Sequence, residues 1–270
     1  MTLDEIGEFG LLGELERRGL AVGIEHDAAR VDGLVVTQDA LVEGVHFRFD
    51  LLSWRELGFR AAAANISDLA ASGAELLALL VALGVPGDAT VADLLELYEG
   101  LNEPGVPVQG GDTTRAGGVF LSVTALGRAG RVPGRAGAPP GDLLVVTGPL
   151  GAAGAGFREG RLPRPPIRLE EVRRLARVAT AMLDVSDGLA ADAAHIAERS
   201  GCRLAIELER VPLADGALAE DVGFGEDYEL LAATPDSLGF PVIGRCETGS
   251  GVGLTLHGEA VELGGWQHFG

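Results

Sequence analysis

The 270-residue sequence contains no lysine, so all 21 of its basic residues are arginines. A P-loop and a protein-kinase domain both place a lysine on the nucleotide phosphates, and the absence of lysine excludes both. It also excludes catalysis through a lysine Schiff base. A general compositional preference for arginine accounts for the absence without functional selection, and the exclusions hold in either case.

Cysteine is scarce, with only Cys202 and Cys246 present. They form no C-x-x-C motif and have no zinc-ligand spacing, so we expect reduced core thiols in a cytoplasmic protein, with a disulfide as the alternative. The acidic, amphipathic N-terminus lacks the basic start and apolar stretch of a signal peptide. The longest apolar run, residues 76–85, is too short to span a bilayer. We therefore expect a soluble protein with no membrane partner.

Positive charge is outnumbered, because 40 acidic residues leave a formal net charge of −19. Nucleic acids are bound through stripes of arginine or lysine that displace counterions, so this composition argues against a nucleic-acid partner. With 47% hydrophobic residues, the chain can bury a sizeable core. Its length fits one large domain or two of ordinary size, and we favour two.

Hydrophobic periodicity predicts an α/β (α+β) fold. Ser53 and Glu56 have the spacing of a capping box that opens an alanine-rich helix. The continuous apolar run at 75–85 is typical of a strand buried on both faces. In the first half, the predicted helices are 3–18, 53–72 and 90–101, and the predicted strands are near 20–24, 33–38, 75–85, 106–109 and 119–128.

The glycine- and proline-rich segment at 130–141 interrupts every pattern, so we expect two domains, at residues 1–136 and 137–270. The second half restarts with the strand "DLLVVTG" and the glycine-rich turn "PLGAAGAG", and a helix is predicted at about 168–180. Such a turn can bind an anion, but it is more often a tight connection. "LDVSDGLAAD" is interpreted as a strand followed by a helix, which places Asp184 and Asp187 where the two meet.

Six aspartates lie beside small residues near the predicted ends of strands or helices, where α/β proteins build their sites. Any one of them alone could simply be a turn or a helix cap, and Asp187 is the clearest such case. Two carboxylates about 4 Å apart repel by roughly 4 kcal/mol at an effective dielectric near 20, so a convergent set needs protons or a cation. The six are Asp27, Asp39, Asp68, Asp112, Asp184 and Asp187.

Oxygen ligands without a histidine–cysteine pattern favour Mg²⁺ over zinc. Magnesium keeps part of its water shell and is often shared between carboxylates and phosphates, which suggests a nucleotide. In "GGDTTR", two glycines allow close approach of a ligand, while threonine hydroxyls and Arg115 can meet anionic oxygens. On its own this motif is a weak signal.

The ordered set of motifs resembles the thiamine-monophosphate kinase family. The superfamily also includes aminoimidazole ribonucleotide synthetase, selenophosphate synthetase and a hydrogenase maturation factor. The resemblance covers nearly the whole chain and runs through "HDAA", "TQDALVEGVHF", "NISDLAASGA", "GGDTTR", "VPGRAGAPPGD", "LDVSDGLAAD", "GEDYEL" and "GWQHF". "EGVHF" and "GEDYEL" are the motifs more specific to the kinase.

The resemblance implies ATP-dependent phosphorylation of thiamine monophosphate to thiamine diphosphate by direct transfer of the γ-phosphoryl group. It also implies a homodimer in which the N-terminal domains pair their sheets, with ATP and Mg²⁺ near that interface. Asp112, Asp184 and Asp187 would be the catalytic residues. The implied metal ligands are Asp27, Thr37, Gln38, Asp39, Asp68, Asp112, Asp184 and Asp187; the implied nucleotide contacts are Gly111, Asp112, Arg135 and Ser186; and the implied contacts to thiamine phosphate are His46, Glu226 and Trp266.

Three of these residues also have a plain structural interpretation. His46 could be a satisfied loop histidine, Trp266 a core residue, and Arg135 a solvated linker charge. Trp266 would suit a cationic thiazolium ring, because an aromatic face attracts a cation by about 0.5 to 2 kcal/mol. No general base is required, since the attacking phosphate oxygen is already ionised at neutral pH.

The chain departs from the family pattern in three ways. Glu25 and His26 stand where glycine and aspartate are usual, Gln38 replaces a threonine, and the second half is short. Two other hypotheses therefore stay open. One is a related ATP-dependent enzyme that acts on a different small phosphate acceptor. The other is a protein that binds nucleotide or thiamine phosphate without turnover.

Overall fold

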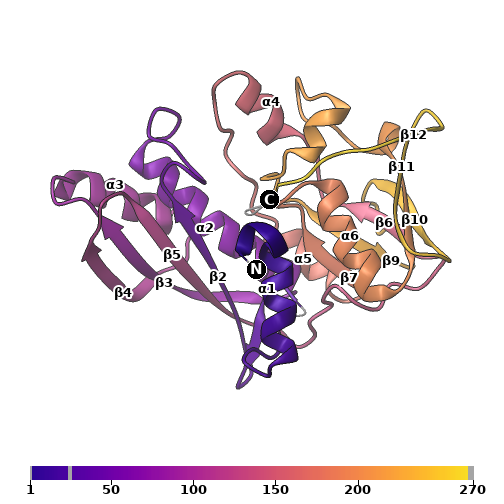
Figure 1. The fold of residues 1–270 in the computed structure, drawn as a ribbon, viewed down its shortest axis with the longest axis horizontal. Helices are drawn as coiled ribbons and strands as arrows, with labels where there is room; N and C mark the ends of the chain where they lie inside the picture. Colours follow the sequence, from indigo (N-terminus) through magenta and orange to yellow (C-terminus); the bar gives the residue numbers. More distant parts are fainter. Residues whose placement is uncertain (1, 24–25, 267–270) are drawn as a thin grey trace.

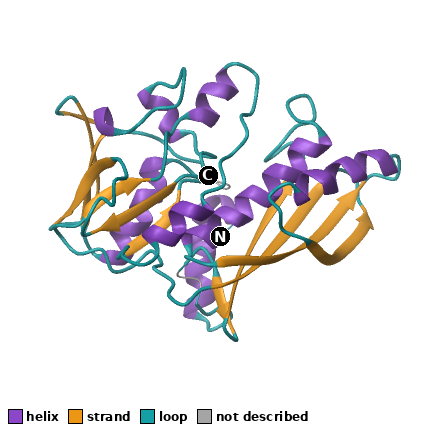
Figure 2. Ribbon diagram, turned by 180° about the vertical axis from the view of Figure 1, so that it is seen from behind, coloured by secondary structure: helices purple, strands orange, loops and turns teal. Residues whose placement is uncertain are grey.

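The computed structural model describes residues 2–23 and 26–266 and contains two β-sheets with helices packed on them (Figures 1 and 2). The first sheet has the strand order β1-β2-β5-β3-β4. β3 and β4 are parallel, and the other neighbouring pairs are antiparallel. The strands are β1 (Ala29–Val31), β2 (Leu34–Val42), β3 (Glu75–Val85), β4 (Val108–Arg115) and β5 (Phe120–Arg128).

Two helices, α2 (Trp54–Ala71) and α3 (Val91–Asn102), cover one face of this sheet. α2 begins as predicted, with Ser53 as N-cap and Glu56 completing the capping box. The two helices pack closely because glycines stand at their contact: a Cβ on Gly58 would lie 2.0 Å from the carbonyl oxygen of Leu97. The backbones can therefore meet without an intervening side chain.

The other face of the first sheet, here called the outer face, is not covered by any described element (Figure 2). Leu77 and Leu80 of β3 point outward and are 41% and 38% exposed, and Val42 of β2 is 39% exposed. The prediction that β3 is buried on both faces is therefore wrong. The sequence run is apolar throughout, but only one layer of helices packs against it.

The second sheet has the order β12-β11-β8-β10-β6-β9-β7. Its strands are β6 (Leu143–Val146), β7 (Ala181–Asp184), β8 (Arg203–Glu207), β9 (Leu230–Thr234), β10 (Val242–Glu247), β11 (Gly251–Leu256) and β12 (Glu259–Val261). The accompanying helices are α4 (Ala152–Arg158), α5 (Leu169–Leu175), α6 (Leu189–Ser200) and the short 3₁₀ turns η1 (Leu208–Arg210) and η2 (Ala219–Gly223).

Helix α2 joins the two halves, because its C-terminal turns also contact β7, β9 and α5 of the second half. Ala70 and Ala71 are fully buried in a core cluster with Met182, Leu230 and Val172. One helix therefore lines both sheets, and residues at its end lie where the halves meet. No helix within residues 2–23 and 26–266 has the length and apolarity needed to cross a bilayer.

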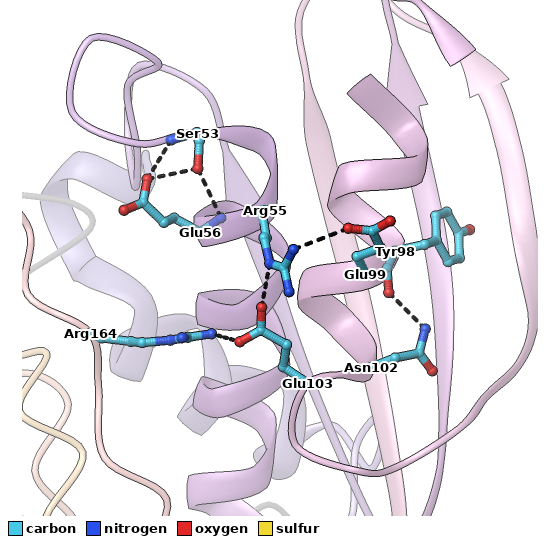
Figure 3. A network of polar contacts seen from close by, with 8 residues as sticks. All are labelled: Ser53, Arg55, Glu56, Tyr98, Glu99, Asn102, Glu103 and Arg164. Atoms are coloured by element: carbon cyan, nitrogen blue, oxygen red, sulfur yellow. Dashed lines mark hydrogen bonds and ion pairs between the residues drawn. The ribbon is translucent and has the colours of Figure 1, made fainter. Parts of the chain in front are cut away.

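Polar contacts also connect the halves at the other end of α2. Arg55 binds Glu99 (3.1 Å) and Glu103 (2.5 Å) of the α3 end, and Arg164 from the second half binds Glu103 as well (Figure 3). The guanidinium of Arg164 also lies 3.6 Å from the centroid of the Phe59 ring. The segment before α5 is thereby held against α2 and α3.

Several predicted boundaries need correction. Within the predicted strand at 20–24, residues 20–23 form no strand, and residue 24 lies outside the described residues. Leu20 and Val22 are 71% and 84% exposed, and the Leu20 N–H donates to the Leu15 oxygen at 2.9 Å. The "GGDTTR" motif is part of β4, which runs to Arg115 instead of ending near 109, because it pairs with β3 along its whole length. α5 ends at Leu175, and β7 begins at Ala181. The N-terminal helix α1 (Leu3–Arg17) is as predicted apart from an irregularity at Gly7.

Candidate functional site

Four of the predicted aspartates gather where α2 meets both sheets. Thr37 of β2 donates its hydroxyl to Asp68 Oδ2 at 2.6 Å and to the backbone oxygen of Asp27 at 3.2 Å. Ser67 of α2 donates to Asp184 Oδ2 at 2.6 Å, across 117 residues of sequence. The fourth, Asp39, lies two residues after Thr37 on the same face of β2. We call Asp27, Asp39, Asp68 and Asp184 the carboxylate cluster.

Burial and mutual repulsion raise the pKa of three carboxyl groups of the carboxylate cluster. Burial, followed by the charges of Asp187 and Asp27, raises the pKa of Asp39 to about 6. Burial and the neighbouring Asp27 raise the pKa of Asp184 to about 7. The pKa of Asp68 is raised well above its ordinary value by burial and by the charges of Asp39, Asp184 and Asp27. Such mutual effects require the side chains to be close, and they favour bound protons or a cation.

Arg135 supplies one positive charge to the cluster. Its Nε donates to Asp27 Oδ1 at 2.9 Å, and its Nη2 binds the same oxygen. The Asp27 side chain is 6% exposed in this pair and that of Arg135 is 23% exposed. Arg135 is therefore a partly buried partner of the cluster, whereas the plain interpretation made it a solvated linker charge.

The positions of the aspartates within their elements differ from those expected. Asp27 precedes β1 instead of following a strand, because no strand forms at 20–23. Asp39 lies inside β2, not at its end, and Asp68 lies in the last turn of α2. Asp184 is the last residue of β7, and Asp187 lies in the loop before α6, as expected. The N-cap residue of α6 is Gly188, which has no side chain to cap the helix.

Gly111 and Asp112 are not part of the carboxylate cluster within one chain. The pairing registers place Asp39, Val123, Val81 and Gly111 in one row across the sheet. Three strand spacings separate Asp39 from Gly111, roughly 14 Å. Asp112 pairs with Ala82 on the outer face, whereas Asp39 faces the helices.

Gln38 is also on the outer face, opposite to Thr37 and Asp39. It is exposed, and its Nε2 donates to Ser122 Oγ at 2.8 Å. A recess of about 430 Å³ lies at the β4 edge, and it is lined by Tyr98, Val108, Gln109, Gly110, Gly111, Asp112 and Thr113. The predicted nucleotide residues Gly111 and Asp112 thus share a recess with an aromatic ring that sequence reasoning missed.

The three predicted substrate residues lie in two places. His46 is in the turn after β2, where its Nδ1 accepts the Val42 N–H at 3.0 Å. Glu226 and Trp266 come together through the loop Ser186–Gly188: the Glu226 N–H donates to the Ser186 oxygen at 2.8 Å, and the Trp266 N–H donates to the Asp187 oxygen at 2.9 Å. The Trp266 residue is 48% exposed, so it is not a core residue.

Glu226 carries two signs of a specialised position. Its φ is 56°, and Tyr228 has a φ of 51°, both in the left-handed region that non-glycine residues seldom adopt. Arg60 of α2 donates to Glu226 Oε2 at 3.0 Å and to the Pro163 oxygen at 2.6 Å, and Arg60 is only 2% exposed. Burial raises the pKa of Glu226, and Arg60 acts in the opposite direction.

Arg60 also lines a pocket of about 130 Å³ between α2, the end of α3 and residues 162–165. Its Nε is buried without a hydrogen-bond partner. His26 Nδ1 is a second buried atom of this kind, and the His26 ring lies against Gly134. Glu25, the other departure from the family pattern, lies outside the described residues, as do residues 267–269 of the terminal motif.

The donor set of the carboxylate cluster fits a hard divalent cation such as Mg²⁺, since it consists of carboxylates and hydroxyls. Both cysteines lie elsewhere as buried free thiols. In the described part of the chain, no three acidic, histidine or cysteine side chains are arranged as a metal site. Three of the four carboxylates instead accept hydrogen bonds from protein side chains, namely from Thr37, Ser67 and Arg135.

Sequence reasoning missed several residues that hold the site. Asn65 accepts the Asp39 N–H at 3.1 Å, and Ser67 binds Asp184. Both belong to the "NISD" motif, so polar residues one and three positions before Asp68 on a helix were a usable signal. No sequence signal marked Arg60 or Asp192. Arg60 contacts Glu226, which is 166 residues away, and the Asp192 side chain accepts backbone N–H groups.

Comparison with known proteins identifies the family of both halves. Residues 25–129 match the family model "AIR synthase related protein, N-terminal domain", and residues 139–238 match "AIR synthase related protein, C-terminal domain". The two matches cover most of the chain. Both halves of the chain thus belong to the AIR synthase related family.

More specific relatives are similar along the whole chain. The thiamine-monophosphate kinase of Aquifex aeolicus is 33% identical over 100% of both sequences. That of Mycobacterium tuberculosis is 35% identical over 100% of this chain and 93% of its own length. The solved structure "AaThiL complexed with AMPPCP and TMP" has a TM-score of 0.91 at 33% identity and covers 100% of this chain and 99% of its own. This chain belongs to the thiamine-monophosphate kinase family.

Proposed function

We propose that this protein phosphorylates thiamine monophosphate to thiamine diphosphate by direct transfer of the γ-phosphoryl group of ATP. The observation that carries the proposal is the carboxylate cluster, which β2, α2, β7 and the segment before β1 build at the junction of the two sheets. Membership of the kinase family over the full length supports the substrate assignment. A related structure binds an ATP analogue together with TMP, which supports both ligands.

We assign the binding of Mg²⁺ to the carboxylate cluster, to Thr37 and to Asp187. When bound there, Mg²⁺ would neutralise charge on the transferring phosphoryl group and on the phosphates flanking it. The protein side chains contribute alignment: Arg135 and Ser186 border the cluster and can contact phosphate oxygens. No side chain has to remove a proton, since the accepting phosphate oxygen is ionised at neutral pH.

We place the substrate along the loop Ser186–Gly188, with Glu226 and Trp266 on one side. The exposed indole of Trp266 suits a cationic thiazolium ring. Glu226 can accept hydrogen bonds from the substrate while Arg60 holds its carboxylate. We also assign His46, which lies in the turn after β2, to the binding of thiamine monophosphate.

We place the nucleotide base in the recess at the β4 edge, beside Tyr98, Gly111 and Asp112. Because Gln38 and Asp112 lie on the outer face, one chain does not bring every assigned ligand to the cluster. We propose a homodimer that covers the outer face and its exposed Leu77 and Leu80. We assign residues 1–136 to nucleotide binding and dimerisation and residues 137–270 to a C-terminal α/β domain. We propose that the protein is cytoplasmic.

The test is an assay with ATP, Mg²⁺ and thiamine monophosphate in which products are identified by mass. The proposal expects thiamine diphosphate and ADP in equal amounts. ADP release stimulated by another phosphate acceptor, but not by thiamine monophosphate, would assign the protein to a different reaction. Tight binding of both ligands by calorimetry without product across a range of Mg²⁺ would replace the kinase with a binding protein.

A further inference from the structure

Asp192 lies in the first turn of α6 and is only 4% exposed. Its Oδ2 accepts the backbone N–H groups of three consecutive residues, Ser186, Asp187 and Gly188, each at 3.0 Å. The N–H groups before a helix have no intrahelical acceptor, so they need another partner. One buried carboxylate oxygen supplies that partner for the whole loop.

Two of these residues also accept hydrogen bonds from other segments through their carbonyl groups. The Ser186 oxygen accepts the N–H of Glu226 at 2.8 Å, and the Asp187 oxygen accepts the N–H of Trp266 at 2.9 Å. The loop is therefore held on one side by Asp192 and on the other side holds two residues assigned to the substrate. A displacement of the loop would displace both.

Backbone contacts leave the loop little freedom to compensate. Gly225 has a φ of 87°, and a Cβ on it would lie 2.3 Å from the Ser186 oxygen. Gly188 has a φ of 118°, and a Cβ on it would lie 2.7 Å from the Gly223 oxygen. The loop and the segment 223–226 are thus packed backbone to backbone, with no side chain between them that could adjust.

We propose that Asp192 is a positioning residue for phosphoryl transfer: it fixes the loop Ser186–Gly188 and, through two backbone hydrogen bonds, sets the positions of Glu226 and Trp266. This inference rests on the proposed function for its catalytic consequence. Its structural content, the anchoring of three amides by one side chain, is independent of the reaction. Asp192 itself is assigned no contact to metal, nucleotide or substrate, and it acts on them through the backbone of the loop.

The experiment compares Asp192→Ala and Asp192→Asn with the unmodified protein. Alanine removes the acceptor, and we expect KM for thiamine monophosphate to rise at least about tenfold, since a shift near 1 Å in a positioned group can cost about a hundredfold. Asparagine keeps a side-chain carbonyl oxygen for the same three amides, and KM is expected to stay within about threefold. If the alanine variant does not fold, Asp192→Ser, with a weaker and shorter acceptor, is expected to fall between the two.

Asp142→Ala is the matched control. Asp142 is also buried in the second half, at 7% exposure, and accepts the Thr180 hydroxyl at 2.6 Å. The control is expected to lose stability while KM and kcat stay within about twofold, because Asp142 holds no residue of the site. A merely structural Asp192 would behave like this control.

Amide hydrogen exchange gives a readout that needs no activity. The N–H groups of residues 186–188 should exchange at least about tenfold faster in Asp192→Ala or Asp192→Ser than in the unmodified protein and should regain protection in Asp192→Asn. Unchanged exchange at these amides, or unchanged KM in a folded alanine or serine variant, overturns the inference. If the unmodified protein makes no thiamine diphosphate, the proposed function fails while the exchange measurement still decides whether Asp192 anchors the loop.

Discussion

The carboxylate cluster predicts that the metal-free protein loses stability as the pH rises. A carboxyl group whose pKa is raised by folding binds its proton more tightly in the folded state. Its stabilising contribution is therefore complete below the unfolded pKa near 4 and is lost as the pH rises through the folded pKa. For Asp39 and Asp184 the folded pKa values are about 6 and about 7, so the loss begins near pH 4 and is complete by about pH 8.

The size of the effect follows from these two values. Between pH 6 and pH 8, Asp184 contributes a loss of about 1 kcal/mol in the free energy of unfolding, and Asp39 contributes a smaller loss. Asp68 acts in the same direction, since its pKa is also raised. A total near 2 kcal/mol corresponds to a fall in Tm of about 5 °C for a chain of this size.

The measurement is thermal and urea unfolding in EDTA at pH 6 and pH 8, repeated with Mg²⁺. The ion competes with protons for the same oxygens, so the gain in Tm from Mg²⁺ should be larger at pH 8 than at pH 6. Asp184→Asn serves as the control, because the amide can still accept the Ser67 hydroxyl but no longer titrates. A metal-free protein that is equally stable or more stable at pH 8 would show that these side chains do not share one pocket.

Three further outcomes are expected. Asp112→Asn should lower Mg²⁺-dependent activity at least about tenfold. The free energy of unfolding should change by less than about 0.5 kcal/mol, because Asp112 is exposed. Unchanged kinetics would remove Asp112 from the metal ligands. Arg60→Met should cost about 3 kcal/mol of stability and raise KM for thiamine monophosphate, because it leaves the Glu226 carboxylate unpaired. Arg60→Lys should keep most of the stability and most of the affinity for thiamine monophosphate. Equal effects of the two variants would argue against the ion pair. Gly58→Ala should lower the free energy of unfolding in urea by about 1 to 3 kcal/mol, because the added Cβ would overlap the Leu97 oxygen. Gly13→Ala is the control: the space around Gly13 is open, so this variant should be neutral or stabilising.

The helices and strands could be predicted where local signals agreed with each other. The capping box at Ser53 and Glu56 marks the start of α2, and the change from an apolar run to "SDG" marks the end of β7. These signals act within a few residues, so the sequence contains them in full. The motif around Asp184 and Asp187 was interpreted correctly for the same reason.

Burial and position within a sheet could not be predicted in this way. β3 is apolar throughout, yet whether a second layer covers its outer face depends on elements elsewhere in the chain or on a second copy. The same limit applies to Asp112, whose face of the sheet follows from the pairing of β4 with β3. The sequence identified Asp112 as a candidate ligand but could not show that it lies across the sheet from Asp39.

Side-chain contacts to backbone atoms and contacts between residues far apart in sequence were also beyond the sequence. Asp192 was part of the quoted motif, but its role appears only when its side chain is seen to accept three main-chain N–H groups. Arg60 and Glu226 are 166 residues apart, and nothing local to either indicates the other. Such residues are found only after the halves are placed against each other.

The left-handed conformations of Glu226 and Tyr228 have a consequence for engineering. Each costs about 1 kcal/mol or more relative to glycine at the same position. A screen that selects only for heat resistance would therefore favour glycine or asparagine at both sites. The most thermostable descendants of this chain would be expected to lose early the Glu226 carboxylate, which we assign to the substrate. Libraries aimed at stability should therefore keep these two codons unchanged.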